Sequence, residues 1–80
     1  MFKKVVCVGI EKREWKDKAT GAVTENWYIH CNVVDSICVA GHCVFSAKIP
    51  PELVAKLEVG KAFRLAYTSY NGYNKVVEVF

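Results

Sequence analysis

Hydrophobic and polar residues alternate along most of this chain, which is the pattern of β-strands that bury one face. The strand predicted over residues 23–34 turns its apolar side chains inward, namely Val23, Trp27, Ile29, Cys31 and Val33. Its other face carries Thr24, Asn26, Tyr28, His30 and Asn32. A strand over residues 43–49 alternates in the same way, and Pro50-Pro51 ends it because proline lacks the N–H that a sheet needs.

The first predicted strand covers residues 2–15 and is rich in valine and isoleucine, but Gly9 interrupts it. Glycine inside a strand often marks a bulge or a sharp bend. A long first strand that bends allows a small barrel to close, because this strand must pair with two partners. A polar turn over residues 16–21 leads into the second strand.

The second half of the chain contains one helical segment and a hairpin. The segment 51–57 begins with proline, carries Glu52 in its first turn and spaces Leu53 and Leu57 four residues apart. Strands over 62–70 and 73–80 flank Asn71-Gly72, a strong hairpin signal. The order predicts an all-β, five-stranded OB-like barrel with one short helix between strands 3 and 4. An SH3-like barrel or an open sandwich is the alternative.

Length and charge narrow the class of protein further. The 80 residues predict a single domain over 1–80, and a net charge of +3 permits a polyanionic partner without requiring one. No stretch is long and apolar enough for a targeting signal or a membrane span, so we expect a cytoplasmic protein, in the host cell if it is phage-encoded, with no membrane partner.

The cysteines are expected to be reduced thiols that pack as small hydrophobic residues, with two disulfides as the alternative. They are Cys7, Cys31, Cys38 and Cys43. A zinc site built from three of them and His42 is not expected, because no CxxC pair is present and adjacent strand residues point to opposite faces. We therefore expect no metal and no cofactor.

Nothing in the sequence predicts catalysis. His30 and His42 lie in different segments, and the chain has no nucleophile elbow and no glycine-rich phosphate loop. We expect a binding module rather than an enzyme.

Candidate binding residues fall into three groups in which cations and aromatic rings occur together, as stacking on bases beside phosphates requires. They are Lys12, Arg13, Trp15, Lys16 and Lys18 in the first hairpin, Tyr28 and His30 on the second strand, and Arg64, Tyr70, Tyr73 and Lys75 around the last hairpin. Structural alternatives exist: Trp15 packs over the barrel end, or the two tyrosines form a stabilising cross-strand pair. The acids Glu11, Glu14 and Asp17 reduce the positive charge of the first group.

The layout resembles the small single-stranded DNA-binding proteins of phages and mobile elements, above all the helix-destabilising proteins of filamentous phages. The resemblance rests on the Lys16-to-Gly21 turn before ENWYIHCNVV, on VFSAKIP before an acidic-proline segment, and on the VGKAF turn before the glycine hairpin. It covers most of the chain, and it implies an OB-type barrel that dimerises and coats single-stranded DNA during replication or transfer. Binding would then fall to Arg13, Lys16, Lys18, Tyr28 and Tyr70 or Tyr73.

We therefore expect a non-catalytic single-stranded DNA-binding protein that forms a homodimer, with RNA as an alternative ligand. A second class of function is a protein-interaction module, such as an inhibitor or a subunit. That module would use the exposed aromatic residues and the apolar segment 37–39 as its anchor. The segment 36–43 is also an alternative dimer contact.

Overall fold

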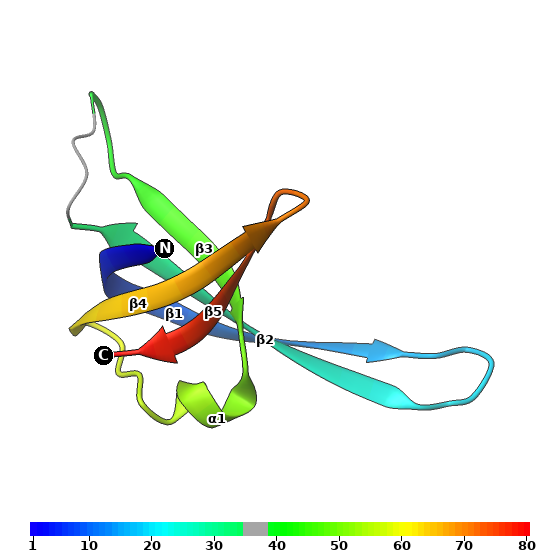
Figure 1. Ribbon diagram of the computed structural model, residues 1–80. Helices are drawn as coiled ribbons and strands as arrows, with labels where there is room; N and C mark the ends of the chain where they lie inside the picture. The colour runs from blue at the N-terminus through cyan, green and yellow to red at the C-terminus, as the bar shows by residue number, and fades with distance from the viewer. Residues whose placement is uncertain (35–38) are drawn as a thin grey trace.

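A computed structural model describes residues 1–34 and 39–80 of the chain, and it is a closed barrel of five strands (Figure 1). The elements are β1 (Phe2–Lys16), β2 (Val23–Val33), β3 (Val44–Ile49), α1 (Pro51–Val54), β4 (Ala62–Tyr70) and β5 (Tyr73–Val79). Around the barrel the strands follow the order β1-β2-β3-β5-β4, and β1 also pairs with β4. The predicted OB-like barrel, with its short helix between strands 3 and 4, is confirmed.

The long first strand closes the barrel by pairing on both of its edges. Its first part pairs with β4 from Phe2 to Val6, and its second part pairs with β2 as far as Lys16. The register with β2 shifts between Cys7 and Gly9, so the bulge predicted at this glycine is confirmed. Because a bulge bends its strand and increases the local twist, β1 can leave β4 here and continue alongside β2.

The core consists of side chains that alternate with exposed ones along each strand. Its fully or nearly fully buried members are Val5, Cys7, Ile29, Cys31, Phe45, Ala47, Ile49, Leu65, Val76 and Val79. In β3 the buried residues strictly alternate with exposed Val44, Ser46 and Lys48, as predicted. Each strand therefore has an outer face that is free to carry function.

The hairpin β1–β2 extends beyond the barrel as a two-stranded arm (Figure 1). Pairing of β2 with β3 begins at Trp27, whereas β1 and β2 remain paired out to Lys16 and Val23. No third strand covers this outer part among the described residues, and Val23, predicted to be buried, is 58% exposed there. The arm accounts for the elongated dimensions of 46 × 25 × 21 Å.

The helix α1 is shorter than the predicted segment 51–57. After Val54, two successive backbone bonds, Lys56 N–H to the Leu53 carbonyl and Leu57 N–H to the Val54 carbonyl, span three residues and tighten the chain into turns. Leu53, Val54 and Leu57 are partly buried and still pack against the core, so the apolar spacing correctly indicated the face that contacts the core. No helix among the described residues is long and apolar enough to cross a membrane.

Within the connection between β2 and β3, the structure describes Val34 and residues 39–43, so the predictions for residues 36–38 lie outside the described residues. Val39 is fully exposed, and residues 39–41 form bends. Cys7 and Cys31 are buried free thiols, as predicted. Cys43 is disulfide-bonded, so the prediction of a reduced thiol is wrong for this residue.

Candidate nucleic-acid interface

One face of the arm gathers aromatic and basic side chains. Beyond the bulge, Glu11 lies opposite Tyr28, Arg13 lies opposite Asn26, and Trp15 lies opposite Thr24. Directly opposed residues in an antiparallel pair share a face. The Trp15 side chain is 62% exposed, which excludes the alternative that it packs over the barrel end.

This face continues onto the barrel without interruption. Tyr28 lies opposite Lys48 on β3, and Lys48 is aligned with Lys75 on β5 in the parallel pairing of these strands. A hollow of about 500 Å³ lies here, lined by Tyr28 and Lys48 on one side and by the β4–β5 hairpin on the other. In OB folds the outer face of strands 2 and 3 and the loop between strands 4 and 5 bind oligonucleotides.

The β4–β5 hairpin contributes a pair of tyrosines to the same hollow. Tyr70 lies opposite Tyr73, and each is 79% exposed. The turn between them has positive φ at both Asn71 (50°) and Gly72 (78°), which is the type I′ geometry that the Asn-Gly pair predicts. Cross-strand stabilisation alone does not require such exposure, so both rings are available to a ligand.

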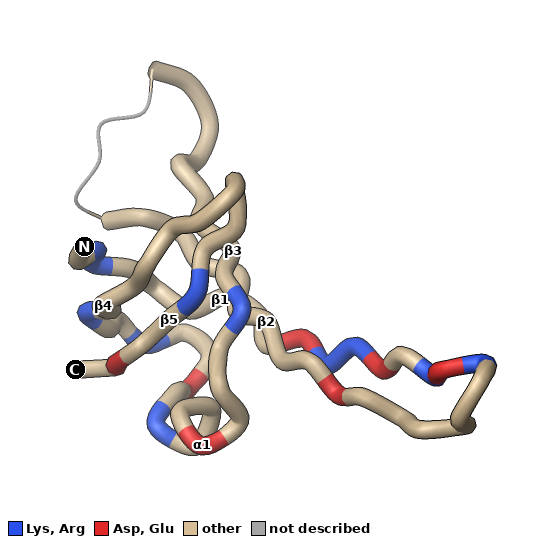
Figure 2. Tube along the Cα trace, turned by 45° about the vertical axis from the view of Figure 1, so that its right-hand side comes forward, with Lys and Arg blue, Asp and Glu red and all other residues tan. Residues whose placement is uncertain are grey.

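We call these side chains the aromatic–basic surface: Arg13, Trp15, Tyr28, His30, Lys48, Tyr70, Tyr73 and Lys75. Figure 2 shows that the arm carries charges of both signs, whereas cationic segments of β3 and β5 lie side by side in the barrel. Neither Lys48 nor Lys75 has an ion-pair partner among the residues that the structure describes. Neighbouring like charges on adjacent strands repel, and an anion between them would relieve this repulsion.

A polar network occupies the part of the surface where the arm joins the barrel. The Glu11 carboxylate oxygen Oε1 lies 3.0 Å from Arg13 Nη2 and 2.9 Å from His30 Nε2. The other imidazole nitrogen, Nδ1, lies 2.8 Å from the Ser46 hydroxyl. The Arg13 guanidinium also lies 4.4 Å from the centre of the Tyr28 ring, so it stacks on that ring as well.

Two members of this network, Glu11 and Arg13, have pKa values that are shifted from their ordinary values. The hydrogen bond from Arg13, followed by that from His30, lowers the pKa of Glu11. The hydrogen bond to Glu11 raises the pKa of Arg13. Both effects favour the charged forms, so the arginine and the carboxylate are paired in the free protein.

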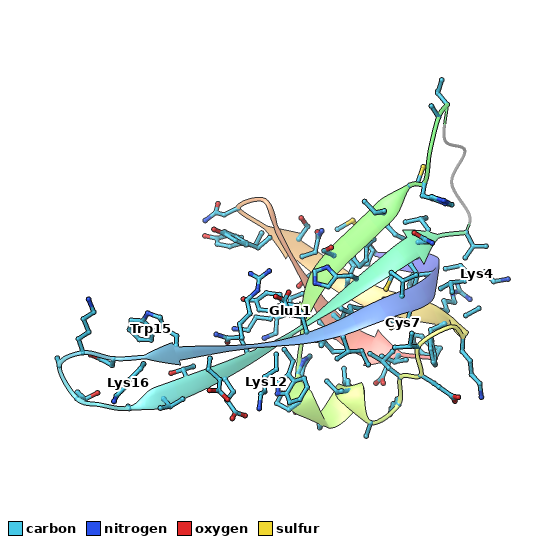
Figure 3. All side chains as sticks on the ribbon, turned by 180° about the vertical axis from the view of Figure 1, so that it is seen from behind. Lys4, Cys7, Glu11, Lys12, Trp15 and Lys16 are labelled. Atoms are coloured by element: carbon cyan, nitrogen blue, oxygen red, sulfur yellow. The ribbon has the colours of Figure 1, made fainter. Side chains whose placement is uncertain are left out.

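Four predicted binding residues lie away from this surface. Lys12 and Lys16 point to the opposite side of the arm from Trp15 (Figure 3). Lys12 is 3.3 Å from Glu14 and lies over the Trp27 ring.

The other two lie at the ends of the molecule. Lys18 belongs to the turn at the tip of the arm, where the Asp17 carboxylate accepts a hydrogen bond from the Ala19 N–H. Arg64 lies on the outer face of β1 and β4, with its guanidinium 5.0 Å from the centre of the Phe2 ring.

Two residues of the interface were not predicted. Lys48 and Ser46 alternate with buried residues, so the sequence indicated that they are exposed. Their proximity to the tyrosine hairpin depends on the parallel pairing of β3 with β5, which no local pattern reveals. No cluster of three or more potential metal ligands is found within residues 1–34 and 39–80.

Comparison with known protein families, with curated proteins and with solved structures finds no match for this chain. Interpretation of the surface therefore depends on its own chemistry.

Proposed function

We propose that this protein is a non-catalytic single-stranded DNA-binding protein and that the aromatic–basic surface is its binding site. The observation that carries the proposal is the alignment of Lys48 and Lys75 beside Tyr28, Tyr70 and Tyr73 around one hollow. Cations that follow a phosphate backbone, next to rings on which bases stack, are what sequence-tolerant single-strand binders use. The resemblance to phage single-stranded DNA-binding proteins supports the same ligand and a role in DNA replication or transfer.

Titration with oligo-dT, followed by tryptophan fluorescence, tests this proposal. Trp15 lies on the surface, whereas Trp27 lies on the other face of the hairpin and packs against the core. Trp27→Phe is therefore expected to keep the fluorescence quenching on binding, and Trp15→Phe is expected to lose most of it. No quenching of the wild-type protein at low salt would refute the proposal.

Aromatic substitutions locate the site independently of fluorescence. Tyr73→Ala and Tyr28→Ala should each cost about 1–3 kcal/mol of binding free energy, the usual contribution of a stacked base. Val59→Ala is the control, because Val59 is an exposed apolar side chain (57%) that lies in the turn before β4 and does not line the hollow. Oligo-rU measured in parallel decides between DNA and RNA, since RNA is the alternative ligand.

A protein contact is the second candidate function, and a different face favours it. Phe2 and Phe80 are 59% and 65% exposed, and their ring centroids are 6.1 Å apart. Apolar groups exposed together favour association with another protein surface. We propose that this face makes the homodimer contact. Sedimentation equilibrium should then show a dimer that Phe2→Ala with Phe80→Ala dissociates, and an unchanged dimer would contradict this assignment.

A further inference from the structure

Glu11 is the one acidic residue among the described strand residues that share the outer face of the arm with Arg13, Trp15 and Tyr28. A carboxylate on a surface that binds phosphates is unfavourable, because the two anions repel. The other acids of the arm strands, Glu14 and Glu25, lie on the opposite face, where both contact Lys12. The position of Glu11 therefore requires a separate explanation.

The carboxylate of Glu11 occupies the place that a phosphate would take at Arg13. Its Oε1 atom lies 3.0 Å from Arg13 Nη2, which is a charge-assisted hydrogen bond of the kind that arginine forms with phosphate oxygens. The same guanidinium lies over the Tyr28 ring. In the free protein the charge of Arg13 is thus paired with that of Glu11, and the arginine covers one face of the Tyr28 ring.

The carboxylate is also held from the barrel side. His30 Nε2 lies 2.9 Å from the same oxygen, and His30 in turn contacts Ser46 on β3. Glu11 therefore keeps its hydrogen bond with His30 when Arg13 moves away. As a result the arginine can exchange between the carboxylate and a phosphate without leaving the carboxylate unpartnered.

We propose that Glu11 is a built-in competitor for Arg13 that weakens single-strand binding at the aromatic–basic surface. This inference rests on the proposed function, which it deepens by naming the residue that sets the affinity. Binding exchanges one arginine–carboxylate pair for an arginine–phosphate pair, so in the wild-type protein Arg13 contributes little net affinity. Without the carboxylate, Arg13 acts as a further phosphate contact.

Glu11→Gln tests the inference with Glu14→Gln as its control, since both remove one negative charge from the same arm strand. One additional phosphate contact on a single strand steepens the plot of log K against log[salt] by about 0.7 and corresponds to about fivefold tighter binding near 0.1 M salt. We expect this gain for Glu11→Gln with oligo-dT, and a clearly smaller gain without a change of slope for Glu14→Gln. Equal effects of the two variants would overturn the inference.

A double-mutant cycle excludes a merely structural role for Glu11. In an Arg13→Gln background, Glu11→Gln should no longer tighten binding, because the group that it releases is absent. A gain that persists without Arg13 would refute the competition. Circular dichroism verifies that each variant is folded.

The same titrations separate failure of this inference from failure of the proposed function. If the wild-type protein binds oligo-dT and Glu11→Gln does not bind it more tightly, the competition is refuted and the function stands. If neither protein binds at low salt, both proposals are wrong.

Discussion

The two lysines that lie side by side on β3 and β5 allow a quantitative prediction. Lys48 and Lys75 are exposed, aligned in register and without an ion-pair partner among the described residues. Each one that neutralises a phosphate of a single strand contributes about 0.7 to the slope of log K against log[salt]. Replacing both with glutamine should therefore make the slope shallower by about 1.4.

This slope converts into a measurable difference in affinity. Between about 50 and about 200 mM salt, two such contacts correspond to about a sevenfold change in the binding constant. The wild-type protein should thus lose about seven times more affinity for oligo-dT over this range than Lys48→Gln with Lys75→Gln. Fluorescence titrations at four or more salt concentrations give both slopes.

Lys61→Gln provides the control, because Lys61 is equally basic and exposed but pairs with Glu58 at 2.8 Å in the turn before β4. Its substitution should leave the slope unchanged. If Lys61→Gln makes the slope as shallow as loss of Lys48 does, the binding is a diffuse response to net charge. The assignment of phosphates to the β3–β5 pair would then be refuted.

Three further predictions concern the barrel itself. Ile29→Ala, at a fully buried core position, should lower the free energy of unfolding by about 2–5 kcal/mol in urea denaturation. A loss of stability as small as that of a surface substitution would contradict the assignment of Ile29 to the core. Burial, followed by the neighbouring Cys7 thiol, raises the pKa of Cys31 to about 12, so mass spectrometry should find Cys31 unlabelled by iodoacetamide until the protein unfolds. The hydrogen bond from Lys56 lowers the pKa of Glu78 from its ordinary 4.5, so the stability that it provides is present above that value and is lost as the pH falls through the lowered pKa. Glu78→Gln should remove this part of the pH dependence in urea titrations, and an unchanged acid profile would argue against the pair.

The strands could be predicted from the sequence because their signals are local. Alternation of Phe45, Ala47 and Ile49 with exposed residues defines a strand and its faces within six residues. The Asn71-Gly72 pair likewise predicts its turn without help from distant residues, since both residues readily adopt the positive φ that a type I′ turn requires. The strand boundaries consequently agree with the prediction to within one residue.

The aromatic–basic surface was predicted only in part, because its assembly depends on pairing between distant segments. Tyr28, Tyr70 and Tyr73 were predicted as outward-facing aromatic residues, and Tyr28 is half-buried in the structure, but nothing local indicates that β3 lies between β2 and β5. Lys48 was missed for that reason. The predicted helix extended too far because the Leu57 spacing indicates contact with the core, and a residue in a turn can make that contact as well as one in a helix.

The bulge in β1 determines which basic side chains of the arm lie on its outer face. The pairing register of β1 with β2 shifts between Cys7 and Gly9, and Val8 has no partner on β2. As a result Ile10, rather than Gly9, continues the inward face of Cys7 and lies opposite Ile29. The bulge predicted at Gly9 therefore sets which face of β1 each following side chain lies on.

If Val8 were paired with β2 and no bulge formed, the strand period of two would keep the odd-numbered positions of β1 on the inward side. Arg13 and Trp15 would then share a face with Trp27, and Lys12 and Lys16 would take their place on the outer face. The extra residue reverses this arrangement, so that the arm presents an exposed indole and an arginine held by a carboxylate to the same side as the β2–β3 surface. Because leaving one residue unpaired exchanges the two faces of the whole arm, the bulge determines which of the arm's cations and rings lie on the same side as the β2–β3 surface.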